Sequence, residues 1–217
     1  MGAHIVFLGP PGSGKGTQSV LLGKKLKVAH VNVGEMLREA IRTKSPVGVT
    51  AREYLDRGEL VPDSLVIRLV GDLLSHPPAS NGFILDGFPR TLLQAEELEK
   101  LLEGDGGKLR HAIYLRVSKE KVLDRLTLRL VCGACSAVYH QKYSPPREKG
   151  KCDACGGGLT GRNDDRPDVV ARRLAIYEKE SQPILDYYRK KGILREVDGN
   201  GRPEEVTRTL YEVVGVK

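Results

Sequence analysis

The feature that most constrains this chain is a glycine-rich loop near its start. The apolar run Ile5–Leu8 leads into Gly9-Pro10-Pro11-Gly12-Ser13-Gly14-Lys15-Gly16-Thr17, and a helix is predicted to begin near Lys15. Glycines let the backbone form a nest of N–H donors around a phosphate, and the helix dipole and the lysine charge add to it. Gly16 stands where the general pattern has Ser or Thr. The phosphate contacts are predicted at Gly12, Ser13, Gly14, Lys15, Gly16 and Thr17.

Apolar runs bounded by turn residues predict a sheet of five strands. The runs are Ile5–Leu8, Val28–Val31, Phe83–Leu85, Ala112–Val117 and Ile193–Val197. Segments with helical spacing separate them, and the last of these is a long helix that continues to about Lys190. Strands that alternate with helices predict an α/β fold, in which a doubly wound parallel sheet is covered on both faces.

Two segments interrupt this alternation. Residues 32–61 hold two short helical stretches and no strand, whereas residues 128–165 are rich in Gly and Cys and poor in apolar residues. We interpret both as lobes inserted at the carboxyl edge of the sheet, where open α/β folds bind ligands. The predicted core domain then comprises residues 1–31, 62–127 and 166–217.

A second polar cluster follows the strand Phe83–Leu85. Asp86 ends this strand, and a carboxylate beside a phosphate loop is well placed to hold Mg²⁺ through its waters. A helix cap or a solvated turn residue is the alternative interpretation of Asp86. Arg90 comes just before a helix, at the rim of the same predicted cleft. A lone arginine in a turn is more often a surface residue, so its role depends on its neighbours.

Three motifs resemble the signatures of adenylate kinases, namely Gly9–Thr17, Gly34–Arg38, and Asp86–Thr91 with Gln94. The segment Gly58–Asp63 is similar to the part of that family which lines the acceptor base, and the resemblance covers essentially all 217 residues. It implies reversible transfer of the terminal phosphoryl group of ATP to AMP, giving two ADP. It also implies an AMP-binding lobe at residues 32–61 and a mobile lid at residues 128–165.

The resemblance further implies which residues contact each nucleotide. On the AMP side they are Val33, Arg38, Glu59, Leu60, Val61, Gly87, Phe88, Pro89, Arg90, Gln94, Arg162 and Arg173. On the ATP side, besides the loop, they are Arg125, Arg129, Val138, Tyr139 and Gly201. The implied catalytic residues are Lys15, Arg90, Arg125, Arg129, Arg162 and Arg173. The family usually has Thr at position 33 and Asp at position 35, where this chain has Val33 and Glu35.

The chemistry of these residues suits phosphoryl transfer. The phosphates of ATP and AMP cannot converge without cationic cover, and arginine binds two phosphate oxygens at once without losing its proton. A phosphate oxygen of AMP is already anionic at neutral pH, so no general base is expected. Catalysis then rests on positioning, electrostatics and a closure that excludes water. The amide of Gln94 can pair with the adenine edge through a donor and an acceptor. Asp164 and Asp165 could tether arginines or form a solvated acidic turn.

All four cysteines lie in one short window. Cys132-x2-Cys135 and Cys152-x2-Cys155 are separated by sixteen residues, which is close to the spacing of two zinc knuckles. A segment this poor in apolar residues cannot hold a fold by burial, whereas a structural zinc contributes about 10–16 kcal/mol in small domains. The pattern predicts a closed, structural Zn²⁺ site in a reducing, cytoplasmic setting; unmetallated thiols or bound iron are the alternatives.

The net charge of +7 indicates an anionic partner without identifying it. A nucleotide-regulated nucleic-acid binder is the alternative from another class, with the cysteines as a zinc ribbon. Aromatic residues make up only 5% of the chain, and the informative arginines are already assigned to phosphates, so no nucleic acid is expected. No apolar run is long enough to span a membrane, and we expect a monomer. Another nucleoside monophosphate kinase, of GTP:AMP or UMP type, remains open.

Overall fold

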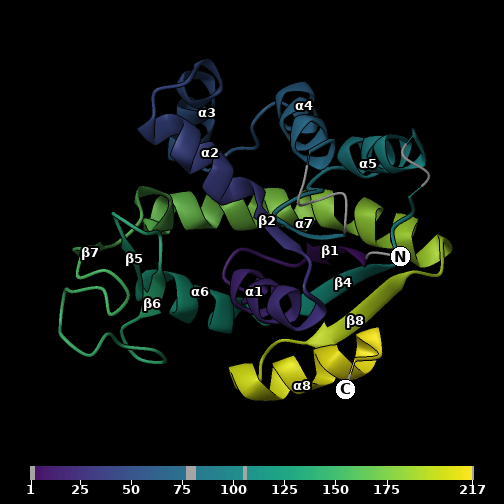
Figure 1. Cartoon of the computed structure of the whole chain (residues 1–217). Coiled ribbons are helices and arrows are strands. Elements are labelled where there is room, and N and C mark those ends of the chain that lie inside the picture. Colours follow the sequence, from purple (N-terminus) through teal and green to yellow (C-terminus); the bar gives the residue numbers. More distant parts are fainter. Residues whose placement is uncertain (1–2, 77–81, 105–106, 217) are drawn as a thin grey trace.

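The computed structural model describes residues 3–76, 82–104 and 107–216. Its centre is a sheet of five strands in the order β2-β3-β1-β4-β8 (Figure 1). The strands are β1 (His4–Leu8), β2 (Ala29–Asn32), β3 (Phe83–Asp86), β4 (His111–Arg116) and β8 (Leu194–Asp198). Every neighbouring pair is parallel, which confirms the predicted α/β fold and its five strands.

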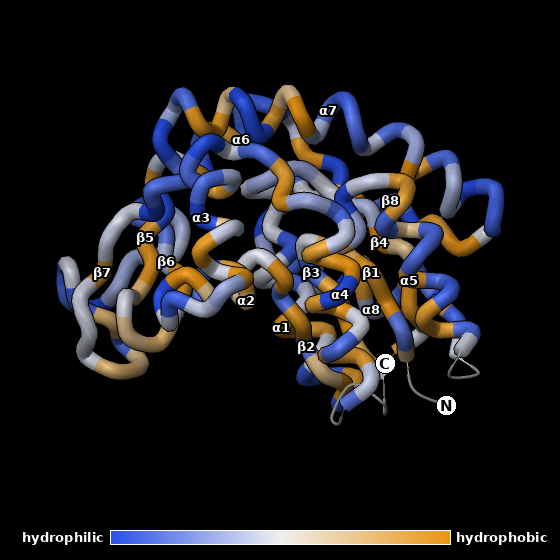
Figure 2. Tube along the Cα trace, turned by 90° about the horizontal axis from the view of Figure 1, so that it is seen from above, coloured by the Kyte–Doolittle hydropathy of each residue, from blue (hydrophilic) through white to orange (hydrophobic). Residues whose placement is uncertain are grey.

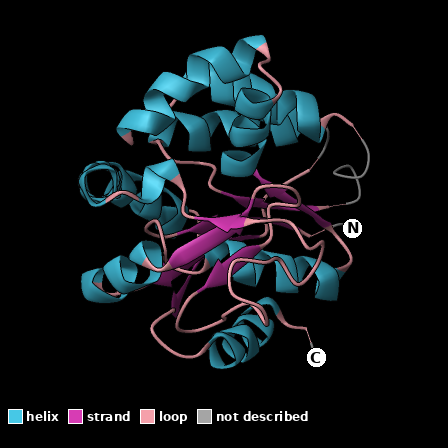
Figure 3. Ribbon diagram, turned by 90° about the vertical axis from the view of Figure 1, so that its left-hand side faces the viewer, coloured by secondary structure: helices cyan, strands magenta, loops and turns pink. Residues whose placement is uncertain are grey.

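Helices cover both faces of the sheet because side chains of β1 alternate between two cores. Ile5 and Phe7 face one core, whereas Val6 and Leu8 face the other. The first core is covered by α1 (Lys15–Leu26) and α8 (Pro203–Val214). The second is covered by α4 (Asp63–Leu74), α5 (Leu92–Gly104) and α7 (Pro167–Lys190). Figure 3 shows the strands between these helical layers, and Figure 2 shows hydrophobic residues gathered along them. No helix in the described ranges is long and apolar enough to cross a bilayer.

The first insertion, here called the helical lobe (residues 32–61), contains α2 (Val33–Arg42) and α3 (Pro46–Arg57). Asn32 caps α2 by accepting a hydrogen bond from the backbone N–H of Glu35 at 2.8 Å, and Ser45 caps α3 in the same way. The helices cross so closely that a Cβ on Gly48 would stand 2.0 Å from the carbonyl oxygen of Ala40. The two helices without a strand are as the sequence predicts.

The second insertion, here called the cysteine lobe (residues 128–165), follows α6 (Lys119–Thr127). It contains a small antiparallel sheet in the order β6-β5-β7, which stands apart from the main sheet (Figure 1). The strands are β5 (Arg129–Cys132), β6 (Val138–His140) and β7 (Leu159–Thr160), and a short helical turn, η2 (Asn163–Asp165), leads into α7.

The register of the main sheet positions the site. Asp86 of β3 pairs with Phe7 of β1 on one side and with Asn32 of β2 on the other. Since the carboxyl ends of parallel strands share one edge, the glycine loop after β1, the start of the helical lobe after β2, and Asp86 all meet there.

Candidate active site

The glycine loop is folded as a nest for an anion. Gly12 and Gly14 have φ values of +76° and +95°, which residues with a Cβ rarely adopt. The N-cap of α1 is Gly14, whose lack of a side chain leaves the first N–H groups of the helix available to a ligand. The Nζ of Lys15 closes the loop by donating to the carbonyl oxygens of Gly9 at 2.6 Å and Pro10 at 2.8 Å.

Burial lowers the pKa of Lys15 to about 7, and the positive charges of Arg90, Arg173 and Arg129 act in the same direction. The carboxylate of Asp86 opposes this shift. A bound phosphate would supply the missing negative charge and restore the ammonium form. The loop is therefore an electrostatic environment that favours an anion.

Asp86 is 5% exposed, and its Oδ2 accepts a hydrogen bond from Nδ2 of Asn32 at 2.6 Å. Asn32 is a residue that the sequence reasoning missed. Its amide oxygen caps α2 while its amide nitrogen holds the carboxylate, so both ends of the side chain are used. The signal was an Asn at the end of a strand with Glu35 three residues later, which is typical of a helix start.

Three of the predicted arginines, Arg38, Arg129 and Arg173, converge around Asp164 and Asp165. Arg129 makes a forked pair with the carboxylate of Asp165, in which Nε donates at 2.7 Å. Arg173 donates to the backbone oxygen of Asp164 at 2.7 Å and contacts the carboxylates of both aspartates at 3.2 and 3.3 Å. Arg38 lies 3.6 Å from the carboxylate of Asp164. Asp165 is 8% exposed and is paired with arginines, so the segment Asp164–Asp165 tethers arginines and is not a solvated acidic turn.

An ion pair joins the cysteine lobe to the helical lobe. Nη2 of Arg162 and Nε of Arg38 each lie 3.1 Å from Oε2 of Glu35. Burial, followed by the charges of Arg38 and Arg129, lowers the pKa of Arg162 to about 10. Burial alone would raise the pKa of Glu35, but Arg38 and Arg162 bring it below its usual range. Cations are thus crowded here beyond what the carboxylates balance.

Arg90 and Arg125 stand at the two sides of the glycine loop. Arg90 is exposed as a whole residue, but its guanidinium lies inside the cleft, where loss of water contacts and the nearby charge of Arg173 lower its pKa to about 10. Arg125 donates to the backbone oxygens of Ser13 at 3.1 Å and Gly199 at 2.9 Å. Gly199 was not among the predicted contacts. Gly201, predicted as an ATP contact, lies in the same turn, where a Cβ at this position would stand 3.0 Å from the carboxylate of Glu205.

A pocket lies between the helical lobe, the segment after β3 and α7, and it contains most of the residues predicted on the AMP side. Three apolar residues of its lining, Leu37, Leu55 and Val66, were not predicted. Phe88 was predicted, but its side chain is fully buried in the core cluster. The residues that line the pocket are Val33, Gly34, Leu37, Arg38, Leu55, Gly58, Glu59, Leu60, Val61, Val66, Gly87, Arg90, Gln94, Asp164 and Arg173.

Gln94 is held in a fixed orientation at this pocket. Its Nε2 donates to Oδ1 of Asp63 at 2.7 Å, and its Oε1 accepts from the backbone N–H of Arg90 at 2.7 Å. An amide has two N–H groups and two lone pairs, so one of each remains for a ligand.

Of the residues predicted on the ATP side, Val138 and Tyr139 lie on β6, where Val138 is 54% exposed. Thr17 is exposed in the first turn of α1.

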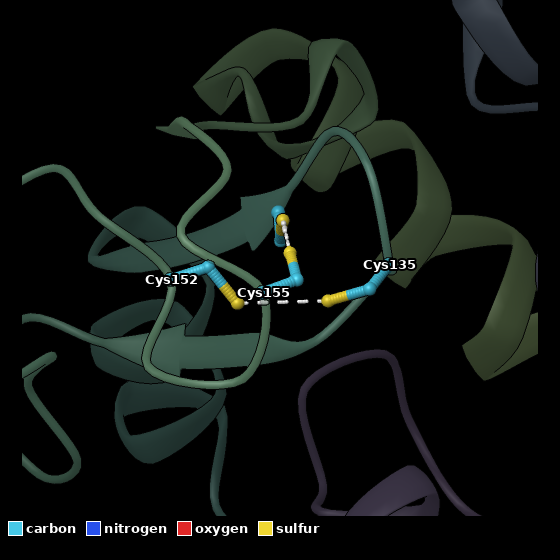
Figure 4. Close-up of side chains that lie close together, drawn as sticks. Cys135, Cys152 and Cys155 are labelled. Atoms are coloured by element: carbon cyan, nitrogen blue, oxygen red, sulfur yellow. Dashed lines mark hydrogen bonds between the residues drawn. The ribbon is translucent and has the colours of Figure 1, made fainter.

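The four cysteines form one cluster (Figure 4). Their Sγ atoms all lie within 4.8 Å of one another, and the Cys132–Cys155 and Cys135–Cys152 pairs are each 3.5 Å apart. Ligands about 2.3 Å from a tetrahedral zinc stand about 3.8 Å apart, so the donor set and its spacing fit that ion. All four thiols are free of disulfides.

A phosphate loop, a cluster of arginines and two lobes inserted at the carboxyl edge of a parallel sheet define a P-loop phosphotransferase that acts on nucleotides. The family model for adenylate kinase matches residues 7–193. The chain is 43% identical to an adenylate kinase of Clostridium tetani over 98% of both chains. It is 46% identical to one of Archaeoglobus fulgidus over 97% of both, and 46% identical to one of Carboxydothermus hydrogenoformans over 95% of this chain and 96% of that one.

This chain therefore belongs to the adenylate kinase family. It is a nucleoside monophosphate kinase that binds ATP, AMP and ADP and converts ATP and AMP into two ADP.

Proposed function

We propose that ATP binds with its phosphates in the glycine loop and its base toward β6, while AMP occupies the pocket beside the helical lobe. The catalytic cations are then Lys15, Arg90, Arg125, Arg129, Arg162 and Arg173. The observation that carries this assignment is that cations from the glycine loop, the segment after β3, α6, the cysteine lobe and α7 lie close together at the carboxyl edge of the sheet. The core domain is then residues 1–31, 62–127 and 166–217, the helical lobe is the AMP-binding lobe, and the cysteine lobe is the lid.

In this assignment Asp164 and Asp165 hold catalytic arginines in position. Asp165 pairs with both Arg129 and Arg173, which orients the two guanidinium groups relative to each other. Such preorganised charge is worth more than flexible charge because it does not have to reorganise during the reaction. The attacking oxygen of AMP is anionic, so the residues supply position and charge and no side chain has to remove a proton.

Asp86 is the proposed protein partner of Mg²⁺, which it would hold through water. When bound, the ion supplies charge that neutralises the β- and γ-phosphate oxygens of ATP. Support comes from a buried carboxylate that is oriented by Asn32 beside the glycine loop. Cys132, Cys135, Cys152 and Cys155 would hold a structural Zn²⁺, since four protein ligands leave no open position for chemistry. We further propose that the enzyme acts as a monomer in the cytoplasm, where thiols stay reduced.

The acceptor pocket favours AMP over other monophosphates. The amide of Gln94 has one donor and one acceptor left, which matches the Watson–Crick edge of adenine. The backbone of Glu59, Leu60 and Val61 lines the same pocket. Val33 is 1% exposed and contributes an apolar wall where the family usually has a hydroxyl.

Turnover of AMP, CMP, UMP and GMP with ATP tests the acceptor, and we expect AMP to be strongly preferred. A preference for CMP or UMP would refute the role of Gln94.

The variant Arg90→Ala should lower kcat by about 10³-fold or more, which is the loss typical of an arginine at the transferring phosphoryl group. Its melting temperature should stay near that of the wild type. Loss of folding would instead make Arg90 a structural residue.

A further inference from the structure

Tyr139 lies between the cluster of four cysteines and the proposed ATP side of the cysteine lobe. It is the middle residue of β6, where it pairs with Leu130 of β5. Its hydroxyl reaches across to the second cysteine pair, where Oη lies 3.5 Å from Sγ of Cys152. The same hydroxyl oxygen lies 2.8 Å from the backbone nitrogen of Asp153. One side chain therefore connects the strand on the proposed ATP side to the loop that carries Cys152 and Cys155.

The direction of these hydrogen bonds follows from the groups involved. The backbone N–H of Asp153 can only donate, so the phenol oxygen is its acceptor. The hydrogen of the phenol is then available for the sulfur of Cys152. A metal-bound thiolate carries no hydrogen and can only accept. The contact thus has one consistent arrangement when a metal is bound, in which Tyr139 donates to the ligand atom.

Cys152 is buried in a loop that is closed by its own hydrogen bonds, so the contact from Tyr139 connects two structural elements. Cys152 is 3% exposed, whereas Cys135 and Cys155 are exposed. Its loop is closed locally by the hydrogen bonds from Cys152 N to Gly157 O and from Gly156 N to Cys152 O, both 2.8 Å long. The hydroxyl of Tyr139 ties this locally closed loop to β6. A change in the position of Cys152 is therefore passed to the strand that carries Val138 and Tyr139.

We propose that Tyr139 is a positioning residue that donates a hydrogen bond to the metal ligand Cys152 and so couples metal occupancy to the affinity of the enzyme for ATP. This inference rests on the proposed metal site and the proposed ATP side. Hydrogen bonds to metal ligands from outside the ligand set are typically worth about 10–100-fold in metal affinity or activity. Because linkage is reciprocal, ATP must tighten metal binding by the same factor by which the metal tightens ATP binding.

The variant Tyr139→Phe removes the hydroxyl and keeps the ring. The matched control is Tyr143→Phe, since Tyr143 is also in the cysteine lobe but its hydroxyl bonds to Asp124 of α6 and not to a cysteine. Competition for zinc against a chromophoric chelator is measured on both purified full-length variants and on the wild type. Each titration is run without nucleotide and with saturating ATP in the absence of AMP.

We expect Tyr139→Phe to bind zinc about tenfold more weakly than the wild type, and Tyr143→Phe to bind it about as tightly. ATP should strengthen zinc binding in the wild type, and most of this strengthening should be lost in Tyr139→Phe. The KM for ATP should rise in Tyr139→Phe, with a smaller change in kcat. When cadmium replaces zinc, the cadmium NMR chemical shift should differ from that of the wild type in Tyr139→Phe and should equal it in Tyr143→Phe.

The outcomes separate the proposal from its premise. A wild-type protein that binds no zinc would remove the metal site and this inference together. Zinc binding in the wild type that is unchanged in Tyr139→Phe would overturn the role of Tyr139 and leave the metal site standing. Weaker zinc binding without any effect of ATP would overturn the coupling.

Discussion

The two lobes inserted into this sheet are held together by different interactions. The helical lobe buries apolar side chains, and Val33, Leu37 and Ala51 belong to the same core cluster as strands of the main sheet. In the cysteine lobe, residues 128–165 are all described, and the side chains buried among them are those of Cys132, Cys152 and Asp165, none of which is a large apolar group. One lobe is an extension of the hydrophobic core, whereas the other has a cluster of cysteines where a core would be.

The two lobes therefore differ in what it costs to displace them from the sheet. A lobe that shares the core cannot leave it without exposing apolar surface, which costs about 25 cal/mol for each Å². A lobe organised around a metal ion carries its own stabilisation, because binding the metal contributes directly to folding. No side chain of residues 128–164 belongs to the hydrophobic core clusters of the described residues, so displacing the cysteine lobe would expose little apolar surface.

The largest effect is expected from Cys152→Ser, which removes one of the four ligands. Zinc content should fall from stoichiometric to near zero, because structural zinc contributes about 10–16 kcal/mol and needs its full ligand set. Limited proteolysis should then cut within residues 128–165 and spare the helical lobe. Elemental analysis gives the zinc content. A variant that keeps its full zinc content would contradict the four-cysteine site.

The next largest effect is expected from Leu37→Ala in the helical lobe. Leu37 is 5% exposed in the main core cluster, so its truncation should lower the free energy of unfolding by about 2–5 kcal/mol. Zinc content should not change. The matched variant Leu130→Ala, on the half-buried strand β5, should cost less. Denaturant unfolding followed by circular dichroism measures both, and equal losses would remove the contrast between the lobes.

A smaller effect is expected where helices α2 and α3 cross. A Cβ on Gly48 would meet the backbone of Ala40, so Gly48→Ala should destabilise the protein by about 1–3 kcal/mol. Gly133 in the cysteine lobe has no atom within 4 Å of such a Cβ, so Gly133→Ala should change stability by less than about 0.5 kcal/mol. Melting curves of the two variants test this pair. An unchanged melting temperature in Gly48→Ala would mean that the helical lobe is not tightly packed.

The smallest effect is expected from Glu35→Gln, which breaks the ion pair between the lobes. Arg162 and Glu35 are partly exposed, so the pair is worth about 0.2–1 kcal/mol. The pKa of Glu35 is lowered, so the pair is intact at neutral pH and is lost as the pH falls through that lowered value. Fluorescence energy transfer between labels on the lobes should report a wider separation in the variant. An unchanged separation at neutral pH would show that the pair does not hold the lobes together.

Much of this molecule could be predicted from local pattern. The strand, glycine loop and helix at Ile5–Leu26 are contiguous in sequence, and the five strands are apolar runs of ordinary length. None of the three strands of the cysteine lobe was predicted, because β5, β6 and β7 have only four, three and two residues and runs so short show no clear periodicity.

The relations within the site were harder to predict because they depend on tertiary contacts. Asn32 reaches Asp86 only because β2 and β3 pair in that register. The burial of Asp165 depends on Arg129 and Arg173 arriving from separate elements. The resemblance implies an ATP contact at Gly201 in the turn after β8, which stays a prediction. The hydrogen bond from Arg125 to the backbone oxygen of Gly199 in the same turn could not be predicted, because no sequence pattern fixes the path of that turn.

The most direct test of the contrast between the lobes is amide hydrogen exchange with and without zinc. The zinc-loaded protein is compared with protein stripped by a chelator, and protection is read separately for residues 33–57 and 129–160. We predict that stripping removes protection from 129–160 and leaves 33–57 protected to the same degree as before. Protection of 129–160 that persists without metal, or a simultaneous loss in both segments, would contradict this account.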